Sequence, residues 1–238
     1  MIDTHAHLDA LDDTDDAIAR AGEAGVTRIL TVGGSEAVAL AEENDGVWAI
    51  VGIHPHDAAG GDVDEIRRLQ RHPKVVAVGE TGLDWFRDYA PRDDQLRVFE
   101  AQLGLATELG KPVVIHTRAA DEDTLAALSG FDGTVVLHCF SSPRLLPTAL
   151  ERGWYVSFAG NATYKNAPDL RVAAAQIPAD RILAETDCPY LAPQPVRGKR
   201  NEPAYVVHTV EALAAARDED AVELGARIDA NASACFGL

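Results

Sequence analysis

The sequence lacks long apolar runs, a cysteine framework and an N-terminal signal. No stretch of about 18 or more uncharged apolar residues occurs, so we expect no membrane span. The first residues carry Asp3 and His5 in place of a basic segment followed by an apolar one, so we expect no secretory signal. The three cysteines are odd in number and lack CxxC spacing, which argues against a disulfide framework and favours a reduced, cytoplasmic setting.

Basic residues are also scarce. Lys and Arg number 21 against 38 Asp and Glu, which gives a formal net charge of −17. Binding duplex nucleic acid through a broad basic surface needs the opposite balance, so we do not expect tight non-specific duplex binding. This total still allows a small local group of cations near a catalytic site. No segment points to an obligate protein partner.

Short apolar segments recur along the chain. Several are rich in Val and Ile and nearly continuous in apolar residues, as expected of parallel strands that are covered on both faces. The predicted strands are 1–7, 26–32, 47–53, 74–80, 112–116, 134–138, 153–158 and 181–186.

Amphipathic segments separate these strands. The predicted helices lie near 13–24, 35–43, 62–71, 92–109, 121–128, 142–151, 168–176 and 203–216, with an accessory helix near 227–236. Eight alternating pairs predict an α/β fold, a single-domain (β/α)8 TIM barrel of the metal-dependent hydrolase type over 1–238. The 238 residues suit this fold, for which about 250 is typical. A doubly wound sheet is the alternative.

His5 and His7 lie at the end of the first apolar segment. Side chains two residues apart leave the same face of a strand, so this spacing points two imidazoles at one place. Imidazole is a ligand for zinc, iron, nickel and copper. The pair therefore predicts a metal site, although a histidine near a strand end is more often a hydrogen-bonded structural residue.

Further potential ligands end other apolar segments in the same way. They are Glu80, His116, His138 and Asp187. Taken singly, Glu80 could pair with an arginine and Asp187 could cap the following turn. Taken together, they predict a ring of ligands at the carboxyl ends of the strands, where barrel enzymes place their chemistry.

We expect this ring to hold two divalent ions a few ångströms apart. Glu80 would bridge them, His5, His7 and Asp187 would complete one site, and His116 and His138 would complete the other. Such a pair can activate water and stabilise charge on the attacked group. The imidazoles permit Zn, Mn, Fe or Ni, and the carboxylates also tolerate Mg.

A second His-x-His pair, His54 and His56, follows the third predicted strand. Pro55 breaks that strand, so the two rings need not converge. We interpret His54 as a substrate-binding or supporting residue in preference to a metal ligand. His56 and His72 are interpreted as structural or exposed.

Three residues neighbour the predicted ligands in the sequence. Glu185 could orient a ligand imidazole, or pair with a buried cation. Cys139 and Cys188 each follow a ligand by one residue, so we expect both to face away from the metals and to pack.

The densest cationic stretch includes Arg197, Lys199 and Arg200, and it follows the eighth predicted strand. Loops in this part of a barrel often bind phosphate, so these residues are candidates for substrate phosphates, with Arg118 as a contributor. A solvated turn is the alternative. Nearby, Trp85, Phe86 and Tyr89 could stack on a base or pack their own loop.

Together these motifs resemble the TatD family of metal-dependent hydrolases. The matching segments are Asp3–Leu8, Gly52–His56, Gly79–Asp84, His116–Arg118, His138–Ser141, Glu185–Leu191 and Arg197–Pro203. The resemblance implies a TIM barrel with a two-metal centre and DNase activity, including 3′-to-5′ exonuclease action.

The resemblance also assigns residues. It places His5, His7, Glu80, His116, His138 and Asp187 on ligand positions, and His54 and Arg118 close to the substrate. The loop around 57–62 is shorter than in the family, which would reshape the substrate groove without touching the metals.

The combined reading is a cytoplasmic two-metal phosphodiesterase that acts on DNA, on single strands or frayed 3′ ends. Asp187 would position or deprotonate the attacking water, and Glu80 would bridge the ions. The alternative is an ester or amide hydrolase on the same scaffold, such as a D-aminoacyl-tRNA deacylase, because some members of the family are associated with that reaction. A barrel that has lost its chemistry is disfavoured by the complete ligand set.

Overall fold

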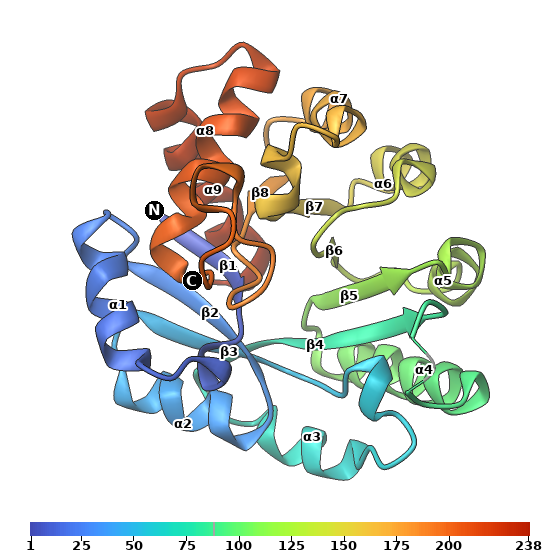
Figure 1. Ribbon diagram of the computed structural model, residues 1–238. Coiled ribbons are helices and arrows are strands. Elements are labelled where there is room, and N and C mark those ends of the chain that lie inside the picture. The colour runs from blue at the N-terminus through green and yellow to red at the C-terminus, as the bar shows by residue number, and fades with distance from the viewer. Residues whose placement is uncertain (88) are drawn as a thin grey trace.

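Eight parallel strands form one sheet that curves into a nearly closed barrel, with helices around its outside (Figure 1). The computed structural model describes residues 1–87 and 89–238. The strands neighbour one another in chain order. They are β1 (Ile2–Ala6), β2 (Arg28–Gly33), β3 (Val47–Val51), β4 (Val75–Asp84), β5 (Val113–Arg118), β6 (Val135–Leu137), β7 (Tyr155–Phe158) and β8 (Ile182–Ala184). The predicted (β/α)8 barrel is confirmed.

Helices connect these strands and cover the outer face of the barrel (Figure 1). They are α1 (Thr14–Glu23), α2 (Ser35–Glu43), α3 (Val63–Leu69), α4 (Arg92–Leu109), α5 (Asp121–Leu128), α6 (Leu146–Glu151), α7 (Pro168–Gln176), α8 (Val206–Arg217) and α9 (Ala221–Phe236). Within the described residues, none of the helices combines the length and the apolar character that crossing a membrane demands.

The apolar strand residues form the core. Ile2, Leu30, Ile50, Ile115 and Leu137 come from five different strands, and each is at most 1% exposed. Parallel strands are buried on one face by the barrel interior and on the other by the helices, so both faces need apolar side chains. The nearly continuous Val and Ile runs in the sequence meet this requirement.

The barrel closes between β1 and the segment that follows β8. The backbone N–H of His7 donates to the carbonyl of Cys188 at 2.8 Å, and that of Asp187 donates to the carbonyl of His5 at 2.9 Å. The hydroxyl of Thr4 also donates to the carbonyl of Ala184 at 3.0 Å. The seam of the barrel therefore brings three of the predicted metal ligands together.

Strand β4 is longer than the predicted 74–80. It continues to Asp84 because residues after Glu80 pair with β5, with Gly82 opposite His116 and Asp84 opposite Arg118. The segment 81–84, which lies beyond the predicted strand, is therefore buried strand. Asp84 therefore lies two strand repeats beyond Glu80 and shares its face. Residue 88 of the expected loop lies outside the described residues.

A buried glutamine fixes the end of β3 beside the predicted site. Gln102 of α4 accepts from the backbone N–H of Ile53 at 2.8 Å and donates to its carbonyl at 3.0 Å. Its amide also donates to the hydroxyl of Thr81 at 2.6 Å. The side chain thus replaces the backbone partners that Ile53 loses where the strand ends, next to His54.

We predict that Gln102→Leu lowers the free energy of unfolding by about 2–4 kcal/mol, because it leaves both backbone groups of Ile53 buried and unpaired. Urea denaturation followed by circular dichroism measures the change. The control is Gln176→Leu on the exposed face of α7, for which we expect a change of about 0.5 kcal/mol or less. Equal losses in the two variants would contradict this account of Gln102.

Candidate metal centre

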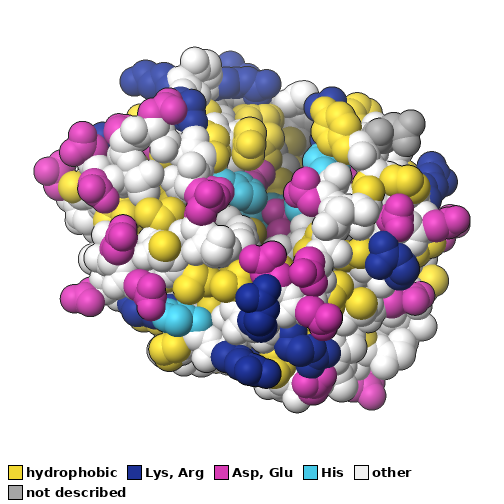
Figure 2. Space-filling view, turned by 90° about the horizontal axis from the view of Figure 1, so that it is seen from below, with side chains coloured by type: hydrophobic (Ala, Val, Ile, Leu, Met, Phe, Trp, Pro, Cys, Tyr) yellow, Lys and Arg dark blue, Asp and Glu magenta, His cyan; other side chains and the backbone are white. Residues whose placement is uncertain are grey.

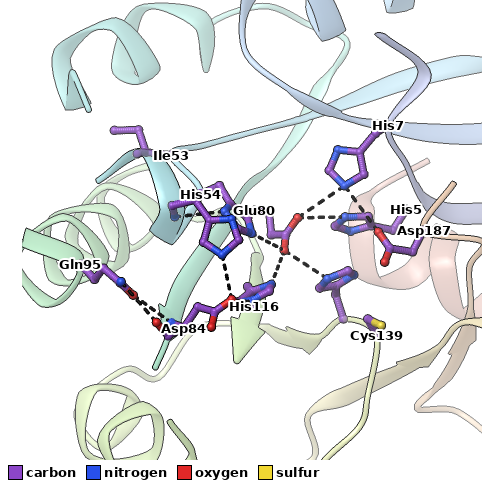
Figure 3. A network of polar contacts seen from close by, with 12 residues as sticks. His5, His7, Ile53, His54, Glu80, Asp84, Gln95, His116, Cys139 and Asp187 are labelled. Atoms are coloured by element: carbon purple, nitrogen blue, oxygen red, sulfur yellow. Dashed lines mark hydrogen bonds and ion pairs between the residues drawn. The ribbon is translucent and has the colours of Figure 1, made fainter. Parts of the chain in front are cut away.

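The carboxylate of Glu80 lies at the centre of the site (Figure 3). It extends from β4 to the open end of the barrel and is 5% exposed. Its Oε2 is 3.2 Å from Nε2 of His5 and 3.8 Å from Nε2 of His7. Since His5 belongs to β1 and His7 follows it, this half of the site lies beside the barrel seam.

The other carboxylate oxygen meets a second group of imidazoles. Oε1 of Glu80 is 2.7 Å from Nδ1 of His116, 3.2 Å from Nε2 of His138 and 3.3 Å from Nε2 of His54. These histidines come from β5, from the end of β6 and from the segment after β3. The two oxygens of one buried carboxylate therefore face two separate sets of ring nitrogens.

Asp187 completes the first set. Its Oδ1 is 3.5 Å from Nε2 of His7, and its side chain points towards the site (Figure 3). Asp187 has a positive φ of 55°, which turns the chain just after β8, and its N–H is fixed by the carbonyl of His5. The alternative role of Asp187, a cap of the following turn, is not needed to explain the position of its side chain.

The imidazoles govern the ionisation of these carboxylates. Burial raises the pKa of Glu80, but His138, His116 and His5 outweigh it, so the pKa lies well below its usual value. Burial likewise raises the pKa of Asp187, and its hydrogen bond with His7 contributes to a net lowering. Both carboxylates are therefore held in the charged form that coordinates cations.

Two of the ring orientations are fixed by further carboxylates. Nδ1 of His138 is 2.9 Å from Oε1 of Glu185, and the N–H of Cys139 donates to that same oxygen at 2.8 Å. A neutral His138 therefore carries its proton on Nδ1 and offers the lone pair of Nε2 to the site. The contact agrees with the interpretation that Glu185 orients a ligand imidazole.

Asp84 acts on His116 in the same manner. Its Oδ2 is 3.3 Å from Nε2 of His116 and 2.8 Å from Nε2 of His56, and its Oδ1 accepts from the backbone N–H groups of Phe86 and Arg87. Burial raises the pKa of Asp84, but the hydrogen bonds with His116 and His56 outweigh it and lower the pKa. Bonding at Nε2 leaves Nδ1 of His116 directed at Glu80.

His54 and His56 lie closer together than the sequence indicated. Their ring centroids are 4.3 Å apart, although Pro55 interrupts the strand. The backbone N–H of His56 donates to Nδ1 of His54 at 3.1 Å, so a neutral His54 carries its proton on Nε2. His54 therefore presents an N–H donor to the site in this form, which agrees with its interpretation as a substrate-binding or supporting residue.

His56 lines the cavity and pairs with Asp84, which agrees with a structural role for this histidine. Asp84 was not recognised from the sequence as part of the site, and it lies buried behind the cavity wall in contact with His56 and His116. Asp84 could have been found by extending the strand alternation from Glu80 through Gly82. His72 does behave as expected, since it pairs with Glu42 at 2.8 Å on the surface.

The site opens into a cavity of about 960 Å³ (Figure 2). Histidine and acidic side chains occupy its floor in this view. Arg87, Tyr89 and Arg118 line one side, and Asn161 and Tyr190 line another. The volume suits a ligand of the size of a nucleotide.

The predicted phosphate-binding residues divide between two places. Arg118 lines the cavity, with its guanidinium 4.0 Å from the ring centroid of Phe86. Arg197 lies over Tyr164 at 3.9 Å, and Arg200 pairs with Asp12 at 3.1 Å. Arg197, Lys199 and Arg200 do not line the cavity itself, so any contact with substrate takes place outside it.

The aromatic residues after β4 also separate. Trp85 donates from its indole N–H to Asp123 at 2.7 Å and lies under the guanidinium of Arg92, which explains it as a packing residue. Phe86 and Tyr89 are more than half exposed, and Tyr89 lines the cavity. Only the latter two remain available for stacking.

The two cysteines beside predicted ligands differ. Cys188 is fully buried, as expected. Cys139 is only half-buried and borders the cavity, and the prediction that it faces away from the metals stays a prediction. Its φ of 44° is left-handed, so the strand alternation on which that prediction rested does not apply at this residue.

The donor set fits divalent metal ions. Ligand atoms bound to one ion at about 2.1 Å lie roughly 3 Å from one another, and the carboxylate–imidazole contacts around Glu80 have this spacing. Among the described residues, four sets of donor atoms lie close enough together to share an ion. They are His5, His7 and Asp187; His5, Glu80 and His138; His54, Glu80 and His116; and His138, Cys139 and Glu185.

Comparison with known proteins agrees with this chemistry. The family model described as TatD related DNase matches residues 2–237. A protein of Bacillus subtilis named uncharacterized metal-dependent hydrolase YabD is 39% identical, with 100% of this chain and 99% of that protein covered. A protein of Shigella flexneri named 3′-5′ ssDNA/RNA exonuclease TatD is 37% identical, with 95% and 94% covered.

A solved structure has the same fold throughout. The crystal structure of YJJV, a TATD homolog from Escherichia coli, superposes with a TM-score of 0.92 at 29% identity, covering 100% of this chain and 98% of that one. The resemblance read from the sequence motifs is confirmed.

We predict that Glu185→Leu lowers the free energy of unfolding by about 2–4 kcal/mol, because it leaves the N–H donors of His138 and Cys139 without an acceptor. Glu185→Gln keeps an acceptor oxygen, so it should lower the free energy of unfolding clearly less. Urea denaturation of both variants in one buffer makes the comparison. A Gln variant as unstable as the Leu variant would argue against hydrogen bonding as the role of Glu185.

Proposed function

The chain belongs to the TatD-related DNase family of metal-dependent hydrolases, and we propose that it cleaves phosphodiester bonds in single-stranded DNA from the 3′ end. A relative that covers nearly the same length is named a 3′-5′ exonuclease of single-stranded DNA and RNA. The acidic surface, with a net charge of −17, favours a substrate held in the cavity over one held along a broad duplex-binding face.

The division of ligands between the two oxygens of Glu80 carries this proposal. Oε2 faces His5 and His7, whereas Oε1 faces His116 and His138. We infer that the site would hold two divalent ions. Glu80, His5, His7 and Asp187 would hold one, and Glu80, His116 and His138 would hold the other. Their imidazole-rich surroundings suit Zn, Mn, Fe or Ni, and the two carboxylates also tolerate Mg.

Bound divalent ions would supply Lewis-acid stabilisation of the attacked phosphoryl group and a lower pKa for water. Asp187 positions the attacking water and accepts its proton, because its carboxylate is charged and borders the cavity. His54 donates from Nε2 to a phosphoryl oxygen, and Arg118 forms a charge-assisted hydrogen bond with another. Arg197, Lys199 and Arg200 contact flanking phosphates beyond the cavity.

One observation favours the second candidate, hydrolysis of an aminoacyl ester. Asp9 and Asp57 line the cavity, where their carboxylates would attract the ammonium group of an amino acid and repel a phosphate. The two reactions are separated by substrate, since aminoacyl-tRNA carries the ammonium group and a DNA oligonucleotide does not.

We predict two divalent ions per chain in the protein purified from metal-supplemented medium. Glu80→Ala should lose most of both, because it removes the bridge, whereas His116→Ala should retain about one. Inductively coupled plasma mass spectrometry gives the stoichiometry. The control is His72→Ala, because His72 pairs with Glu42 on the surface and is not a predicted ligand; this variant should keep both ions. A wild-type stoichiometry of one would refute the two-ion centre.

We predict that the wild-type protein with Mg²⁺ or Mn²⁺ shortens a 5′-labelled single-stranded oligonucleotide from its 3′ end. Asp187→Asn should lower kcat by about a hundredfold or more, since it removes the proton acceptor. Gel electrophoresis resolves the ladder, with EDTA and His72→Ala as controls. If the wild type leaves DNA intact but releases the amino acid from aminoacyl-tRNA, the nuclease proposal is wrong and the ester reaction replaces it.

A further inference from the structure

Asn161 has a buried polar atom that the proposed chemistry does not use. It follows β7 in a short helical turn, Gly160–Thr163, and lines the cavity. Its Oδ1 is buried and has no hydrogen-bond partner among the described residues. An unpaired buried acceptor is unfavourable, so Asn161 is stabilised when its carboxamide turns into the cavity that it lines and accepts a hydrogen bond from a ligand.

The turn that carries Asn161 is held firmly against the loop after β8. A Cβ on Gly160 would lie 2.1 Å from the carbonyl oxygen of Leu191, so only glycine allows this approach. The N–H of Gln194 donates to the hydroxyl of Thr163 at 2.7 Å, and the hydroxyl of Tyr164 donates to the carbonyl of Ala192 at 3.1 Å. The two loops form one wall, so Asn161 has a fixed position.

Tyr190 stands on the same wall and borders the metal centre. Its side chain is 57% exposed and lines the cavity, and its ring centroid is 5.9 Å from that of His7. Its carbonyl is fixed by the amide of Asn201 at 2.6 Å. An exposed ring on a fixed backbone is suited to stacking on a flat ligand.

We propose that Asn161 and Tyr190 form a subsite for an unpaired nucleobase next to the scissile phosphate. The carboxamide of Asn161 offers a donor and an acceptor side by side, which matches the edge of a base that has lost its pairing partner. Tyr190 stacks on the face of that base. This inference rests on the proposed nuclease function. It adds that the protein recognises a base beside the phosphate, and not the sugar–phosphate backbone alone.

The test compares single-stranded oligonucleotides that differ only in their 3′-terminal residue, a normal nucleotide or an abasic analogue. Asn161→Leu replaces the amide with two methyl groups on the same branched skeleton and should lower kcat/KM on the normal strand about tenfold, with little change on the abasic strand. The matched control is Asn166→Leu on the exposed part of the same loop, which should alter neither. An equal loss on both strands would overturn the inference.

A binding measurement separates this inference from the proposed function. Fluorescence anisotropy with nuclease-resistant phosphorothioate strands reports affinity in the metal-loaded protein without turnover. In one outcome, the wild type cleaves no strand but binds the normal end more tightly than the abasic end, and Asn161→Leu loses this preference. The nuclease proposal then fails, whereas the subsite is supported. In the other outcome, the wild type cleaves DNA but neither assay shows a preference for a terminal base. The nuclease proposal is then supported, and the subsite is refuted.

Discussion

A single buried carboxylate determines the arrangement of the active end of this barrel. Glu80 is nearly inaccessible to solvent, and five imidazoles approach its two oxygens from four different parts of the barrel. A buried charge is costly unless it is paired and hydrogen-bonded, so the position demands cationic or donor groups on every side. The same demand makes the position selective for metal ions. Glu185 and Asp84 then hold two of the imidazoles in the orientation that this centre requires.

The order of the strands places these imidazoles and carboxylates next to one another. Because the strands are parallel and adjacent in chain order, their carboxyl ends meet on one rim, and ligands that are far apart in the sequence become neighbours. The seam between β1 and the residues after β8 is the most consequential of these junctions. Its two backbone hydrogen bonds involve His5, His7 and Asp187, so closing the barrel and assembling half of the site are the same event.

Residue patterns predicted much of this, and their failures have local causes. The His5–His7 spacing was informative because both rings reach the same carboxylate, and Glu80, His116, His138 and Asp187 were recognised because each ends an apolar segment of the sequence. Strand alternation does not apply at Cys139, because its backbone is left-handed and the residue borders the cavity. Asp84 was missed because its role depends on contacts across space. Pairing with β5 extends the strand to this residue, and the ring of His56 meets it after Pro55. Unpaired groups such as Asn161 leave no trace in the sequence.

The seam also determines when the centre can first exist during biosynthesis. His5 and His7 leave the ribosome long before Asp187, because the intervening chain takes on the order of ten seconds or more to synthesise. Until then the nascent chain holds its first two imidazoles without the partners that define the site. Since ligand affinity for divalent ions generally follows a fixed chemical order, the ion that is acquired depends on what the cell offers once the barrel has closed. An ion that needs the donors on both sides of the seam can therefore bind only after the last strand has joined the barrel.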